Sequence, residues 1–194
     1  NYGFYFGASN DNLEDIKRLD PRSACGIKVF MGASTGNMLV DNPQTLEKIF
    51  EHAPTLVATH CEDTPTILAN EEKMRAQYGD EIPFELHPQI RSTEACVKSS
   101  TLAIDLANRF GTRLHVLHIS TAEEVAAFAS GPITRKQITA EACVHFLHFS
   151  SDDYAQKGAL IKCNPAIKTP ADRDAIISGL LEDRLDLIGT DHAP

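Results

Sequence analysis

Short apolar runs alternate with longer segments of helical spacing along this chain of 194 residues. This alternation is typical of βαβ units that build a parallel sheet. The runs are almost continuously apolar, as expected for strands that are covered on both faces. The pattern predicts six strands, over 2–7, 26–31, 55–60, 114–120, 137–143 and 185–191.

Residues that start or stop helices stand between these runs. They are an Asn-Pro pair at 42–43 before a helix over 44–52, a capping box of Thr121 and Glu124, Thr169 before Pro170, and Gly111 after a helix over 94–110. The segment 71–90 contains a glycine and two prolines, and its composition predicts a surface loop or lid. The chain therefore predicts six strand–helix alternations.

Charge and cysteine content narrow the function classes. The formal net charge is −9, and no run of Lys or Arg offers a face for nucleic acid or acidic lipids. The apolar stretches are far shorter than the roughly 20 residues that cross a bilayer. The five cysteines are scattered without a CxxC pair, which argues against a disulfide framework and favours a reducing cytoplasm. The chain begins with Asn1 rather than Met, so we expect it to start inside a longer protein.

Metal-competent side chains recur at the carboxyl ends of three predicted strands. His60, His118 and Asp191 each close an apolar run. A single buried histidine in such a place is more often structural than a ligand. Because a parallel barrel builds its active site at the carboxyl rim from several strands, the three together predict a site.

The remaining histidines fit that site less well. His115 lies three residues before His118, so strand alternation predicts that it points to the opposite face, toward the helices. His52 on a helix and His87 in the predicted loop are expected to be solvated. His145 could reach the rim, at best as a supporting residue.

Lys28 is unusual because it lies inside an apolar strand, where an unpaired ammonium would be costly. It either pairs with a carboxylate at the rim or is neutralised by chemistry. A neutral lysine amine can take up carbon dioxide and form a carbamate, an anionic oxygen ligand able to bridge two metals.

Six motifs together resemble the amidohydrolase superfamily, specifically its dihydroorotases. The resemblance runs in order from residue 26 to the last residue, and its motifs are Gly26-Ile-Lys-Val-Phe-Met, Thr59-His-Cys-Glu-Asp, His118-Ile-Ser-Thr, Ala140-Glu-Ala-Cys, Asn164-Pro and Asp191-His-Ala-Pro. It implies a (β/α)8 TIM-type barrel, with residues 1–194 as one incomplete domain that covers strands 3 to 8.

The resemblance also implies a site with two Zn²⁺ ions. In it, a carbamylated Lys28 bridges the metals, and His60 and His118 bind one of them. Asp191 binds the other metal and shuttles the proton, and Asn164 contacts the substrate. Glu62 and Glu141 are candidates for orienting the ligating histidines.

This chain departs from the family pattern in places. The family's first-strand His-x-His pair, with the arginine and asparagine near it, does not occur in this sequence. The family also has a substrate-binding histidine beyond the aspartate motif, and the printed sequence, which ends at Pro194, does not contain it. Val144-His-Phe stands where the family has Pro-His-His.

The implied reaction is the reversible hydrolysis of the cyclic amide of L-dihydroorotate to N-carbamoyl-L-aspartate in pyrimidine biosynthesis. We expect a small-molecule substrate as the partner and neither nucleic acid nor a membrane. The expected location is the cytoplasm, and a homo-oligomer is compatible with the sequence. The nearest alternative is another cyclic amidohydrolase, a hydantoinase (dihydropyrimidinase) or allantoinase, although Ala193 resembles dihydroorotases more than those relatives. A non-catalytic assembly subunit that has the same fold is the second alternative, and a sugar-phosphate barrel is the weakest.

Overall fold

The computed structural model describes residues 1–32, 34 and 37–192, so Ala193 of the last motif lies outside the described residues. Within them, six parallel strands form one sheet in chain order, β1-β2-β3-β4-β5-β6. The strands are β1 (Tyr5–Gly7), β2 (Gly26–Phe30), β3 (Val57–His60), β4 (Leu114–Val116), β5 (Ile138–Cys143) and β6 (Leu187–Gly189). All six predicted strands are confirmed, each with shorter bounds than predicted.

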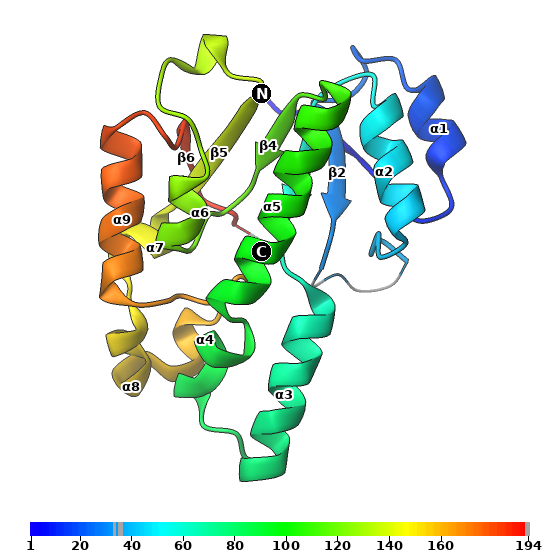
Figure 1. Ribbon diagram of the computed structural model, residues 1–194. Helices are drawn as coiled ribbons and strands as arrows, with labels where there is room; N and C mark the ends of the chain where they lie inside the picture. The colour runs from blue at the N-terminus through cyan, green and yellow to red at the C-terminus, as the bar shows by residue number, and fades with distance from the viewer. Residues whose placement is uncertain (33, 35–36, 193–194) are drawn as a thin grey trace.

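The helices follow the strands as expected for βαβ units. They are α1 (Leu13–Arg18), α2 (Pro43–His52), α3 (Thr64–Tyr78), α4 (His87–Ile90), α5 (Thr93–Phe110), α6 (Ala122–Ala126), α7 (Val144–His148), α8 (Tyr154–Lys157) and α9 (Pro170–Leu181), with 3-10 turns at Phe84–Leu86, Ile133–Arg135, Ser151–Asp153 and Gly158–Ile161. In Figure 1, α1 and α2 lie beside β2, α5 passes in front of β4, and α9 lies on the side of β6. The helices therefore surround a curved sheet, as in a segment of an α/β barrel. No helix of the described residues is long and apolar enough to cross a membrane.

The strand register separates two faces of the sheet. One row of register partners runs across four neighbouring strands, from β2 to β5: Lys28, Ala58, His115 and Thr139. Directly paired residues of neighbouring strands point to the same side, so these four share one face. The alternate residues, such as Ile27, are fully buried in the core that packs against the helices. The first row therefore lies on the concave face, which is the inner face of a barrel.

Local capping signals explain where the helices begin and end. The side chain of Asn42 accepts a hydrogen bond of 2.9 Å from the Thr45 amide at the start of α2, and Thr169 forms a reciprocal capping box with Asp172 at the start of α9. Gly111 ends α5 in the left-handed region, at φ 70°. Glycine adopts this conformation without steric cost, so these predicted boundaries are confirmed.

The predicted loop over 71–90 is wrong for most of its length. Helix α3 continues to Tyr78 and ends at Gly79, where φ is 65°, and α4 occupies the end of the segment. The helix is stabilised by exposed charge pairs such as Glu71–Arg75 rather than by a buried stripe. Hydrophobic spacing alone does not reveal such a helix.

Candidate functional site

Two histidines from neighbouring strands meet at the carboxyl rim of the sheet. His60 is the last residue of β3, and His118 lies two residues beyond the end of β4, with φ at 42°. The Nδ1 atom of His60 lies 3.0 Å from the Nε2 atom of His118, and the rings meet edge to face. Both side chains are buried. The structure thus brings together two of the four predicted metal ligands.

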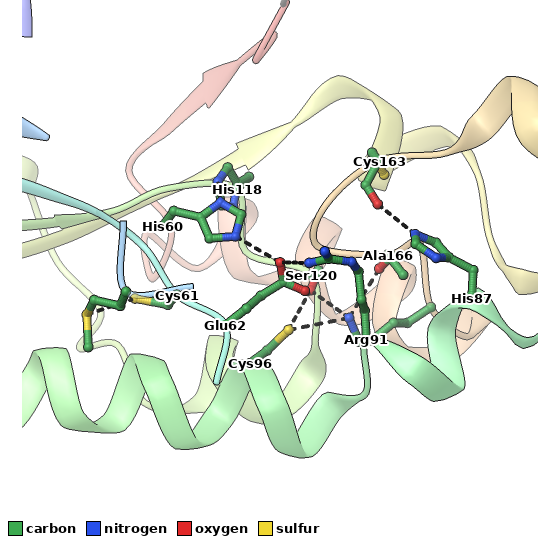
Figure 2. A network of polar contacts seen from close by, with 12 residues as sticks. His60, Cys61, Glu62, His87, Arg91, Cys96, His118, Ser120, Cys163 and Ala166 are labelled. Atoms are coloured by element: carbon green, nitrogen blue, oxygen red, sulfur yellow. Dashed lines mark hydrogen bonds and ion pairs between the residues drawn. The ribbon is translucent and has the colours of Figure 1, made fainter. Parts of the chain in front are cut away.

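Glu62 sets the orientation of the His60 ring. The Nε2 atom of His60 lies 2.8 Å from Oε2 of the fully buried Glu62 (Figure 2). Burial alone raises the pKa of this carboxyl, but the hydrogen bond from His60 and the charges of His60, Arg91 and Lys168 hold the pKa below its ordinary value. An ionised carboxylate only accepts hydrogen bonds, so His60 carries a hydrogen on Nε2, and its Nδ1 atom faces His118.

His118 is held neutral by its surroundings. Burial lowers its pKa well below the ordinary value, and the charges of His60 and Lys28 lower it further. Its Nδ1 atom is buried and has no hydrogen-bond partner among the described residues. Neutral imidazole is the form that binds a metal ion.

The histidine pair fits one metal ion. Two nitrogens bound to the same Zn²⁺ at about 2.0–2.1 Å in a tetrahedron lie about 3.3 Å apart, close to the observed separation. Within residues 1–32, 34 and 37–192, no group of three or more His, Cys, Asp or Glu side chains could hold a metal. The pair therefore supplies two nitrogen donors, and further ligands must come from elsewhere.

Lys28 points into the same region from β2. Its Nζ atom lies 4.6 Å from the centre of the Phe30 ring, and burial lowers the pKa of its ammonium, against the opposing charges of Asp191 and Glu141. Among the ion pairs of the described residues, none involves Lys28. The lysine is therefore easier to deprotonate than an exposed one.

Asp191 follows β6 at the open edge of the sheet, with φ at 47°. It lines a cavity of about 270 Å³ together with His145, Lys162 and His192. Burial lowers the pKa of His145, and the charge of Asp191 opposes that shift. His145 does lie at the rim, as the sequence indicated. Asn164 is exposed and follows Cys163, which also lines the cavity.

One prediction about the other histidines is wrong, and another holds only in part. His115 lies on the concave face, not toward the helices: its Nδ1 atom is 2.9 Å from the Thr139 hydroxyl, and its Nε2 atom is 3.4 Å from Glu141. The alternation argument fails because β4 ends at Val116 and the backbone turns before His118. His87 is half-buried rather than fully solvated, and its ring nitrogen Nε2 lies 3.0 Å from the Cys163 carbonyl.

The two glutamates expected to orient the histidines have different roles. Glu62 contacts the ring of His60, whereas Glu141 accepts a hydrogen bond of 3.2 Å from the backbone amide of His118. Glu141 therefore positions the chain at His118 and the ring of His115, but not the ring of His118.

The sequence did not single out two cations beside this site, the partly buried Arg91 and the buried Lys168. Arg91 forms an ion pair of 2.5 Å with Glu62, and Lys168 is 4 % exposed. Figure 2 shows Arg91, Glu62 and His60 in one line of contacts. Lys168 could have been singled out from the sequence, because it is a basic residue that directly follows the apolar residues 165–167. Nothing in the local pattern marks Arg91.

Comparisons with known proteins find cyclic amidohydrolases, both by sequence and by structure. No family model matches the chain. The allantoinase of Deinococcus radiodurans is 29% identical over 203 residues, which cover 100% of this chain and 44% of that protein. The dihydroorotase of Staphylococcus aureus is 30% identical over 173 residues, covering 84% of this chain and 37% of that protein. The L-hydantoinase of Arthrobacter aurescens superposes with a TM-score of 0.88 at 22% identity, over 99% of this chain and 43% of that chain.

The fold is that of an amidohydrolase TIM-type barrel, present here as an incomplete segment. The relatives of the chain are cyclic amidohydrolases, which are hydrolases, and this supports its assignment to the amidohydrolase superfamily. The chain spans less than half the length of the curated relatives that it matches.

Proposed function

We propose that the protein carrying this chain is a metal-dependent cyclic amidohydrolase. The observation that carries the proposal is the buried pair of His60 and His118, whose facing nitrogens lie 3.0 Å apart at the carboxyl rim. Such a pair of imidazoles, one oriented by a carboxylate, is the arrangement of metal-binding histidines. The order of Lys28, His60, His118 and Asp191 along the chain matches the ligand order of the superfamily that the sequence resembles.

The proposed roles follow the position of each side chain. His60 and His118 would hold one Zn²⁺ ion, and Lys28, as a carbamate, would bridge it to a second ion that Asp191 also binds. When bound, such ions polarise an amide carbonyl and lower the pKa of water. Asp191, at the edge of the 270 Å³ cavity, accepts the proton of the attacking water and returns it to the leaving amide nitrogen. Asn164 contacts the small-molecule substrate from the loop beside Cys163.

We propose dihydroorotate as the substrate, and N-carbamoyl-L-aspartate as the product of its hydrolysis. The motifs of the chain resemble dihydroorotases, and the matching dihydroorotase is 30% identical. A specific observation also favours allantoin: the match to an allantoinase extends over 100% of the chain at 29% identity. Both substrates are cyclic amides, and the site described above would serve either.

Purified full-length protein distinguishes these functions. We expect zinc to co-purify and the protein to open the ring of dihydroorotate, measured by loss of ring absorbance, with allantoin, hydantoin and dihydrouracil as competing substrates. Asp191→Asn serves as the control, since it keeps an oxygen donor but loses the proton shuttle. Faster turnover of another ring would replace dihydroorotate as the substrate. Absence of both zinc and turnover would favour an assembly subunit.

A further inference from the structure

We infer that Arg91 is a positioning residue that fixes the ring of His60 for metal binding, acting through the buried carboxylate of Glu62. This inference rests on the proposed metal centre and adds a residue from a different part of the chain. It assigns a role to the segment between α3 and α5, which lies outside the strand ends that carry the ligands.

The Glu62 carboxylate is held by one oxygen. Its Oε2 atom receives both the His60 Nε2–H at 2.8 Å and the Arg91 Nη1–H at 2.5 Å, whereas Oε1 has no hydrogen-bond partner among the described residues. Glu62 is fully buried. A buried carboxylate that loses its cationic partner is strongly destabilised, because the imidazole alone does not neutralise its charge. The direction of Oε2, and with it the rotation of the His60 ring, therefore depends on Arg91.

Arg91 is itself held in place by the segment around it. Its backbone amide donates to the His87 carbonyl at 2.9 Å at the end of α4. Asn70 on α3 holds both sequence neighbours of Arg91: its side-chain amide donates to the Ile90 carbonyl at 3.2 Å and to the Ser92 hydroxyl at 3.3 Å. The guanidinium is thus presented to Glu62 by a segment bonded to both α3 and the start of α5. A preorganised donor loses little conformational entropy when it holds its partner.

Lys168 supplies a second positive charge close to Glu62. Its Nζ atom donates to the Ser120 hydroxyl and the Ala166 carbonyl, both at 3.1 Å, and contacts Cys96 Sγ at 3.5 Å. No carboxylate of the described residues lies within ion-pair distance of Lys168. Since Ser120 follows His118 by two residues, Lys168 also ties down the segment that carries the second histidine. Arg91 thus contacts the carboxylate that orients His60, and Lys168 contacts the segment that follows His118; Figure 2 labels the contact residues Glu62, Ser120, Cys96 and Ala166.

The same chain offers a matched control. Arg109 forms an ion pair of 2.9 Å with Glu47, but its side chain is 64% exposed. Exposed pairs contribute little. Removing its charge therefore tests for a general effect of losing an arginine.

The experiment measures the equilibrium affinity of metal-free, full-length protein for Co²⁺, from its visible absorption, with no substrate present. We expect Arg91→Met to weaken Co²⁺ binding about 10- to 100-fold, the range typical of residues that orient a ligand. Arg91→Lys should recover part of the loss because it restores the charge, and Arg109→Met should stay within about twofold of wild type. If Arg91→Met does not fold, as judged by circular dichroism, Arg91→Gln takes its place.

A double-mutant cycle separates positioning from general stability. In a Glu62→Gln background, Arg91→Met should weaken Co²⁺ binding by less than about threefold, because the residue through which it acts is already altered. If the loss of Co²⁺ affinity in the double variant equals the product of the two single losses, Arg91 acts by another route and the inference is overturned. Wild-type Co²⁺ affinity in Arg91→Met would overturn it as well.

The metal measurement keeps this inference distinct from the proposed reaction. A protein whose Co²⁺ affinity depends on Arg91 as expected, but which opens no cyclic amide, would refute the reaction and support the positioning role. An active protein with unchanged Co²⁺ affinity in Arg91→Met would do the reverse. A wild-type protein that binds no Co²⁺ would overturn both.

Discussion

The Nδ1 atom of His60 and the Nε2 atom of His118 face each other at 3.0 Å, although 58 residues separate them in the chain. The parallel pairing of β3 with β4 brings the two segments together, and the turn at His118 directs its ring back toward His60. Because Glu62 occupies the other nitrogen of His60, only Nδ1 is available for a shared ion.

This relationship predicts strongly non-additive mutations. His60→Ala and His118→Ala should each lower metal content to below about one tenth of wild type. The double variant should be hardly worse than either single one, because ligands of one ion act as a unit. Metal analysis of the purified full-length variants measures this. His52→Ala, on an exposed helix face, is the control. Independent, multiplying losses would show that the two histidines do not share an ion.

Lys28 should be carbamylated in the metal-loaded protein. Burial favours its neutral amine, which is the form that reacts with carbon dioxide. Crystallographic density should extend three atoms beyond Nζ, with two oxygens about 2.0–2.2 Å from the metals. Lys28→Ala should lose most activity, and Lys28→Glu should restore part of it with a shorter carboxylate. An ordinary ammonium bonded to Asp191 in a metal-loaded, active protein would rule the carbamate out.

Gly32 should be required for the position of Glu62. A Cβ atom at residue 32 would overlap the backbone carbonyl of Glu62, which cannot yield as a flexible side chain would. Gly32→Ala is therefore expected to lower both the melting temperature and the Co²⁺ affinity. Gly111→Ala is the matched control, since its φ of 70° costs about 1–2 kcal/mol but nothing lies near the added atom. The control should lose stability and keep its Co²⁺ affinity; an unaffected Gly32→Ala would refute the close approach.

Glu124 should make stability depend on pH. It is buried and accepts a hydrogen bond of 2.9 Å from the Thr121 hydroxyl. Burial raises its pKa in the folded state, and the nearby charge of Lys168 opposes that shift. At pH below the unfolded-state pKa, both states hold the proton and Glu124 costs nothing. As pH rises through the folded-state pKa, the unfolded state has already released its proton, and the folded state is penalised for ionising.

Glu124→Gln should remove that penalty. We expect its free energy of unfolding, measured in urea, to exceed that of wild type at pH 7.5, and the difference to shrink toward pH 4. Glu123→Gln, its exposed neighbour, should show no such trend. A difference that is independent of pH would mean that Glu124 is not destabilised when ionised.

The amino-acid sequence by itself determined the strands, the boundaries of α2 and α5, the starts of α6 and α9, and the parallel α/β class. Runs such as 26–31 are apolar apart from Lys28, and the caps at Asn42, Thr169 and Gly111 act within a few residues, so both signals are local. The charged second half of α3 was not predicted as a helix, because the charge pairs that stabilise it leave no apolar stripe in the sequence.

Only the tertiary structure decided which side chains meet. His115 and His118 could be assigned to faces only once the end of β4 and the left-handed turn at His118 were known, since alternation holds within a strand and not beyond it. Arg91 reaches Glu62 across 29 residues, and Lys168 reaches Ser120 across 48. Such contacts depend on how α4 and the loop after Asn164 pack against the rim, and packing between distant segments leaves no periodic signal in the chain.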